Sequence, residues 1–160
     1  LIGITRAGKS SIIQKFPLGV NQGGKREIQY MSDEGERYKL VIFDTPCIDE
    51  SASNDPTYYQ NANAVIFLGS YDLQESLTAF PELRNHLHKF IDPSSYISYF
   101  AMNKCDIKGS KGVVTLQDVQ KAKEELHVDH VYDISIQEKI GVRNLFEIIA
   151  HELHKKLGNK

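Results

Sequence analysis

Near its start the chain carries a string whose residue types and spacing suit phosphate binding, Gly3-Ile4-Thr5-Arg6-Ala7-Gly8-Lys9-Ser10. Glycines on either side of a short segment let a loop turn its backbone N–H groups inward, where they can surround phosphates. The Lys9 ammonium would supply a point charge to the outer phosphates, and the Ser10 hydroxyl would be a ligand of Mg²⁺. A helix directly after the loop would add its dipole. The pattern therefore predicts a phosphate-binding loop.

A second string, Asn103-Lys104-Cys105-Asp106, follows an apolar run and is suited to guanine. The Asp106 carboxylate can accept two hydrogen bonds, from N1–H and from the exocyclic amine of the base. Adenine lacks this pair of donors and would leave the carboxylate unmatched. Asn103 can bridge neighbouring loops and reach the purine, and the aliphatic stem of Lys104 can lie along the ring. The two strings together predict a guanine-nucleotide site.

Two further signals follow other apolar runs. Leu40-Val41-Ile42-Phe43-Asp44 ends in an acid whose burial would be costly unless it faced a charge, and the water shell of Mg²⁺ supplies one. In Asp133-Ile134-Ser135-Ile136-Gln137 a backbone N–H could meet the base oxygen. We therefore expect a metal residue at Asp44 and a base-contacting loop at Ser135 and Ile136.

The histidines and cysteines predict no further centre. His151 and His154 are three residues apart, whereas the zinc-protease pattern needs a separation of four, so a solvated helix face is expected. Cys47 and Cys105 are too few for a disulfide framework and are expected to be free thiols of a cytosolic protein.

Composition indicates one soluble domain over residues 1–160, with 41% hydrophobic and 25% charged residues. A net charge of −2 predicts no strong attraction to nucleic acid. No apolar run approaches the roughly 20 residues of a membrane span, and the chain ends without a cysteine for prenylation. We expect a cytoplasmic protein with no membrane anchor of its own, brought to membrane surfaces only through partners. Because the chain starts inside an expected strand, we also expect residues before Leu1.

Apolar strand-like runs alternate with helical runs along the chain, which predicts a mostly parallel sheet with helices on both faces. Strands are expected at 1–3, 38–43, 64–68, 96–102 and 128–134, with 27–31 forming a hairpin with 38–43, and a loop at 19–25. Helices are expected at 9–16, 75–90, 115–127 and 142–157, with Pro81 at a boundary or kink and a capping box at Thr115. Both strings follow strands, where ligands bind in such sheets.

These motifs, in this order over nearly the whole chain, resemble the Ras-like superfamily of small GTPases. The resemblance implies a three-layer α/β G-domain with a six-stranded sheet, GTP or GDP with Mg²⁺, and slow hydrolysis controlled by protein effectors or regulators. By position, Ser10 and Asp44 would hold the metal. The nucleotide-binding residues would be Thr5, Arg6, Ala7, Gly8, Lys9, Ser10, Ser11, Asn103, Lys104, Asp106, Ser135 and Ile136.

Four departures from the family pattern concern the γ-phosphate. No Thr lies between Ser10 and Asp44, where the family carries one that senses Mg²⁺ and this phosphate. The family's Asp-x-x-Gly ends here in Cys47, which lacks the backbone freedom of glycine. Ile48 replaces the Gln that orients the attacking water. Thr5 stands where Ras-type members often have Gly, and its side chain would crowd the transition state.

These departures predict very slow GTP hydrolysis with no assigned catalytic residue, since phosphoryl transfer depends on positioning and charge stabilisation. Gln60 and Gln22 are candidate substitutes, although nothing singles them out. One alternative is a nucleotide-stabilised scaffold without turnover. Another is a P-loop enzyme that uses ATP, such as a small kinase, against which Asp106 argues.

The subfamily stays open. Gly8-Lys9-Ser10-Ser11-Ile12-Ile13-Gln14-Lys15 and Asp55-Pro56-Thr57-Tyr58 are similar to stretches of the Rag (Gtr-like) branch, whose members work as heterodimers in nutrient signalling. Asn103, where that branch usually has His, and the lack of its dimerising domain stand against this assignment. Rab-like and Miro-like membership remain alternatives, and a second GTPase subunit is a partner only in the Rag case.

Overall fold

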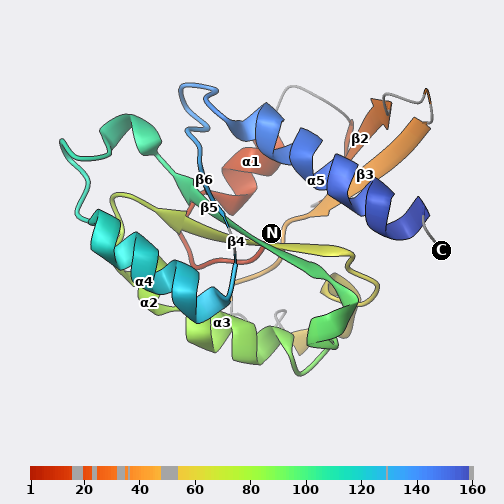
Figure 1. Cartoon of the computed structure of the whole chain (residues 1–160), viewed down its shortest axis with the longest axis horizontal. Helices are drawn as coiled ribbons and strands as arrows, with labels where there is room; N and C mark the ends of the chain where they lie inside the picture. The colour runs from red at the N-terminus through yellow and green to blue at the C-terminus, as the bar shows by residue number, and fades with distance from the viewer. Residues whose placement is uncertain are drawn as a thin grey trace.

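The computed structural model describes residues 1–15, 20–22, 25–31, 35, 37–47, 54–128 and 130–158 (Figure 1). Strands β4 (Ala64–Ser70), β5 (Ile97–Asn103) and β6 (Val131–Asp133) form a parallel sheet in this order. Strands β1 (Val20–Gln22), β2 (Lys25–Met31) and β3 (Arg37–Phe43) form an antiparallel sheet. The expected hairpin is confirmed by β2 and β3, whereas the loop expected at 19–25 is wrong because β1 lies within it.

The first residues of the chain lie between the two sheets. Ile2 makes a parallel bridge to Phe67, with hydrogen bonds of 2.9 Å from Ile2 N to Ile66 O and from Leu68 N to Ile2 O. On the other side, the Leu1 nitrogen donates to Phe43 O at 2.9 Å. The α/β class is therefore confirmed, but the described residues form two three-stranded sheets rather than one clear six-stranded sheet, since only residues 1–2 join β3 to β4.

Helices follow the strands as the alternation predicts. They are α1 (Lys9–Lys15), α2 (Glu75–Thr78), α3 (Phe80–Leu87), α4 (Leu116–Leu126) and α5 (Val142–Gly158), with short 3₁₀ turns at Pro56–Tyr58, Pro93–Ser95 and Cys105–Ile107. The helix expected at 75–90 is divided at Ala79, and Pro81 lies in the first turn of α3, where its missing N–H has no helical partner to lose. The capping box is confirmed, because Thr115 and Asp118 bond reciprocally to each other's backbone N–H.

Helices cover both faces of the parallel sheet. Figure 1 shows α2, α3 and α4 on one side of β4–β6, and α1 and α5 on the other. Alternate residues of each strand enter two different cores, so that Phe67 and Phe100 face α2–α4 whereas Leu68 and Ala101 face α1 and α5. Burial on both faces explains why β4 reads as a continuous apolar run.

Neither a membrane span nor a further metal centre appears in the described part of the chain. None of its helices is long and apolar enough to cross a bilayer. No group of three or more His, Cys, Asp and Glu residues gathers there in a way that could hold a metal ion. His154 instead packs against Tyr38 of β3 with the two rings tilted by 46°, and its Nε2 lies 3.1 Å from the Tyr38 hydroxyl, whereas His151 is exposed.

The packing of α5 gives a prediction for stability. Leu145 is fully buried in the core between α5 and the sheet, so Leu145→Ala should lower the free energy of unfolding by about 2–5 kcal/mol. Urea denaturation followed by circular dichroism measures this loss. Arg143→Ala, which removes only an exposed pair with Glu147, is the control and should stay within about 0.5 kcal/mol. Equal losses in the two variants would contradict the assigned core.

Candidate functional site

The phosphate-loop string forms a tight turn at the carboxyl end of the sheet. Gly8 has φ +108°, and a Cβ there would collide with the Asn103 amide nitrogen. A Cβ on Gly3 would come within 2.7 Å of the Leu68 carbonyl oxygen. Both glycines are therefore required by close approach, and Gly8 also by its left-handed backbone. α1 begins at Lys9, directly after the turn.

Lys9 lies folded across the loop, with 6% of its surface exposed. Its Nζ donates to Gly3 O at 2.6 Å and to Ile4 O at 3.3 Å. The same Nζ lies 3.3 Å from Cys47 Sγ, and Thr5 Oγ1 donates to that sulfur at 3.1 Å. The ammonium is thus held inside the loop, at the place where a phosphate chain would need a positive charge.

Asp44 follows β3 and carries the one buried side-chain N or O atom of the described residues that lacks a hydrogen-bond partner, Oδ1. An orphaned carboxylate oxygen is unfavourable unless a cation or its water shell satisfies it. Ser10 is exposed in the first turn of α1. A serine hydroxyl and a carboxylate are oxygen ligands of the kind that Mg²⁺ prefers, so these residues fit the metal that the family pattern implies.

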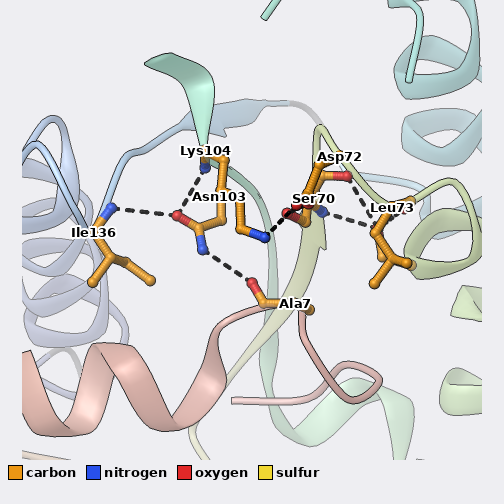
Figure 2. A network of polar contacts seen from close by, with 8 residues as sticks. Ala7, Ser70, Asp72, Leu73, Asn103, Lys104 and Ile136 are labelled. Atoms are coloured by element: carbon orange, nitrogen blue, oxygen red, sulfur yellow. Dashed lines mark hydrogen bonds and ion pairs between the residues drawn. The ribbon is translucent and has the colours of Figure 1, made fainter. Parts of the chain in front are cut away.

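A single buried amide joins three loops that are far apart in the sequence. Asn103, which is 3% exposed, donates from Nδ2 to Ala7 O at 3.0 Å. Its Oδ1 accepts from Lys104 N at 2.8 Å and from Ile136 N at 3.3 Å. Figure 2 shows this network, in which the phosphate loop, the guanine string and the loop after β6 meet at one side chain.

Lys104 is fixed by residues that sequence reasoning missed. Its backbone is left-handed, with φ 62°, and its Nζ lies 2.6 Å from Asp72 Oδ2 (Figure 2). Ser70 Oγ donates to the other Asp72 oxygen at 2.6 Å. Burial raises the pKa of Asp72, but the hydrogen bonds from Lys104 and Ser70 outweigh burial and keep this pKa below its ordinary value. No spacing signal marks Asp72, because it contacts the string only through the pairing of β4 with β5.

The remaining base-side residues occupy two neighbouring loops. Asp106 lies in the 3₁₀ turn Cys105–Ile107, where its carboxylate is exposed. Ser135 is buried; its backbone N–H and C=O pair with Ile140 at 3.0 and 2.9 Å, and its hydroxyl accepts from Glu138 N. These contacts hold Ile136 N toward Asn103, so the geometry brings Asp106 and residues 135–136 to the same edge of the sheet.

The candidate water-positioning residues fall elsewhere or outside the described residues. Gln60 lines a cavity of about 490 Å³ with Ala64 and Val65, at the amino end of β4. The phosphate loop lies at the opposite end of this strand, since Ile2 runs parallel to Phe67 and the loop follows it. Gln60 is therefore not placed to orient an attacking water. The side chain of Gln22 and all of Ile48 lie outside the described residues.

Comparison with known proteins assigns the chain to a family. A family model described as the Ras family matches residues 1–155. The human Ras-related protein Rab-30 is 27% identical over 162 residues, covering 96% of the chain and 77% of that protein. The Ras-related protein RabZ of Dictyostelium discoideum is 24% identical over 163 residues, covering 97% of the chain and 70% of that protein. The chain therefore belongs to the Ras family and is a small GTPase domain.

The amide network gives a prediction for the loops. Asn103→Ala removes the partner of Ala7 O and of two backbone N–H groups, and buried groups left unmatched should lower the free energy of unfolding by about 1–3 kcal/mol. Thermal and urea denaturation measure the loss. Asn144→Ala, at an exposed position of α5, is the matched control and should change stability by less than about 0.5 kcal/mol. A loss no larger than that of the control would contradict the bridging role.

Proposed function

We propose that this domain binds GDP and GTP with Mg²⁺ at the edge where residues 3–10, 103–106 and 135–136 meet, and that it hydrolyses GTP very slowly. The observation that carries the proposal is the Asn103 network, which couples a phosphate-binding loop to a guanine-reading string through one buried side chain. Membership of the Ras family supports the same ligand.

Each residue then has a role that follows from its position. Lys9 would hold the outer phosphates, and backbone N–H groups of the loop and of the first turn of α1 would surround them. Those N–H groups belong to Thr5, Arg6, Ala7, Gly8, Ser10 and Ser11. Mg²⁺, when bound, supplies charge neutralisation between phosphates, with Ser10 and Asp44 as the residues that would hold it.

On the base side, Asp106 would accept from the guanine donors while the Lys104 stem covers the ring. The Asp72 carboxylate positions that stem, because it fixes the far end of the Lys104 side chain at 2.6 Å. Ile136 N would meet the base oxygen, with Ser135 behind it. A carboxylate that reads two donors discriminates strongly against a base that lacks them.

Hydrolysis is proposed to be slow because Ile48 replaces the water-orienting Gln and Gln60 lies at the opposite end of β4. Cys47 stands where the family pattern has glycine, and its sulfur contacts Lys9 and Thr5.

Protein effectors and regulators would then distinguish the nucleotide states. The composition of the chain supports action in the cytoplasm, at membrane surfaces only through partners, and a second GTPase subunit applies only if the Rag-like assignment holds.

The ligand can be tested directly. Protein purified without added nucleotide should retain GDP or GTP, and single-turnover hydrolysis with Mg²⁺ should be slower than roughly 4 × 10⁻⁴ s⁻¹, the intrinsic scale of a member that carries the water-orienting Gln. Asp106→Ala should weaken GDP binding by about a hundredfold or more and reduce the preference over ADP. Glu82→Ala, an exposed carboxylate of α3, should bind as the parent does. Failure to bind any guanine nucleotide would refute the proposal, and binding with no turnover would favour the scaffold alternative.

The metal contribution has its own test. Removal of Mg²⁺ with EDTA should speed GDP release about tenfold or more, equivalent to about 1.4 kcal/mol, because the phosphates lose a neutralising charge. Asp44→Asn should release GDP at the EDTA rate even when Mg²⁺ is present. Its thermal stability without nucleotide should fall little, since Oδ1 accepts no hydrogen bond and only the electrostatic attraction to the Leu1 ammonium is lost. An unchanged release rate in Asp44→Asn would remove Asp44 from the metal site.

A further inference from the structure

Thr5 of the phosphate loop contacts Cys47, which lies 42 residues further along the chain. Thr5 Oγ1 donates to Cys47 Sγ at 3.1 Å. Each of them departs from the family pattern on its own, and the structure shows that the two departures form one contact. The Lys9 ammonium joins the same contact, since its Nζ is 3.3 Å from the Cys47 sulfur.

The Lys9 ammonium has no proton left over. An ammonium carries three N–H donors. Here its Nζ has acceptors at Gly3 O, Ile4 O and Cys47 Sγ, at 2.6, 3.3 and 3.3 Å. A phosphate oxygen can therefore bond to Lys9 only by displacing one of them, and the sulfur is the weakest acceptor of the three.

The segment that carries Cys47 is anchored by the residues that precede it. Thr45 is buried and its Oγ1 donates to Leu1 O at 2.6 Å. Pro46 fixes its own φ and restricts the residue before it to extended backbone. Cys47 itself is 9% exposed. The preceding residues thus position the thiol, and moving it away would break its contacts with Lys9 and Thr5.

We propose that the Thr5–Cys47 contact makes this site selective for the diphosphate over the triphosphate. The inference rests on the proposed function, because it concerns the same loop. A diphosphate needs one N–H donor of Lys9. Cys47 Sγ can give up its hydrogen bond from Lys9 and still accept the one from the Thr5 hydroxyl. A third phosphate brings further oxygens to the same end of the loop, so that the thiol and the hydroxyl must separate and the anchored segment must move.

The test compares the Kd of GDP with that of the β,γ-imido analogue of GTP, both with Mg²⁺. The parent should prefer GDP by about tenfold or more. Cys47→Gly should bring the two affinities within about threefold of each other, chiefly through tighter binding of the analogue, because the contact is gone. Cys47→Ser is the matched control: its hydroxyl can still accept from Lys9 and Thr5, so the preference should remain.

Thr5→Gly tests the same contact from its exposed side, where loss of fold is not expected, and should narrow the preference as Cys47→Gly does. In the double variant, the preference for GDP should narrow no more than in the more affected single variant, because both substitutions break the same contact. Equal affinities in the parent, or a preference unchanged in both single variants, would overturn this inference alone. If the parent bound neither nucleotide, the proposed function itself would fail.

Discussion

The burial of one carboxamide is the constraint on which the site depends. Asn103 lies at the carboxyl end of β5 with almost no exposed surface, so its donor and its acceptor must both be satisfied within the protein. Ala7 O, Lys104 N and Ile136 N supply those partners only when three loops are in register (Figure 2). Gly8 is the other half of the constraint, because any larger residue would collide with the same amide.

The parallel sheet explains why this constraint can be met. β4 and β5 pair in register from Ala64 and Ile97 to Ser70 and Asn103, so both strands end at the same level. Tyr71 N then donates to Asn103 O at 3.1 Å, which extends the ladder by one bond. The residue after Tyr71 is Asp72, and the residue after Asn103 is Lys104. Their ion pair is therefore a consequence of the register between β4 and β5, and this pair holds the Lys104 side chain in position.

Local signals predicted local features well. The spacing of Thr115 and Asp118 specified a helix start, the glycines of residues 3–10 specified a turn, and Pro81 marked a helix boundary, because each depends on backbone chemistry within a few residues. The two-sheet arrangement, the Lys104–Asp72 pair and the Thr5–Cys47 contact were not predictable in this way. Each depends on which strands become neighbours and in what register, and no pattern along one segment encodes that.

At the phosphate end of the site, Lys9 already has hydrogen-bond partners whereas Asp44 Oδ1 has none. This difference decides which contacts of a ligand would lower its binding free energy most. The Lys9 ammonium has three acceptors before any phosphate arrives, so a phosphate exchanges one bond for a better one rather than adding a new bond. Asp44 Oδ1 accepts no hydrogen bond, so a metal and its waters would add interactions there without breaking one. Most of the gain on nucleotide binding should then come with the metal and the base. The third phosphate, which must compete with Cys47 for Lys9, contributes least.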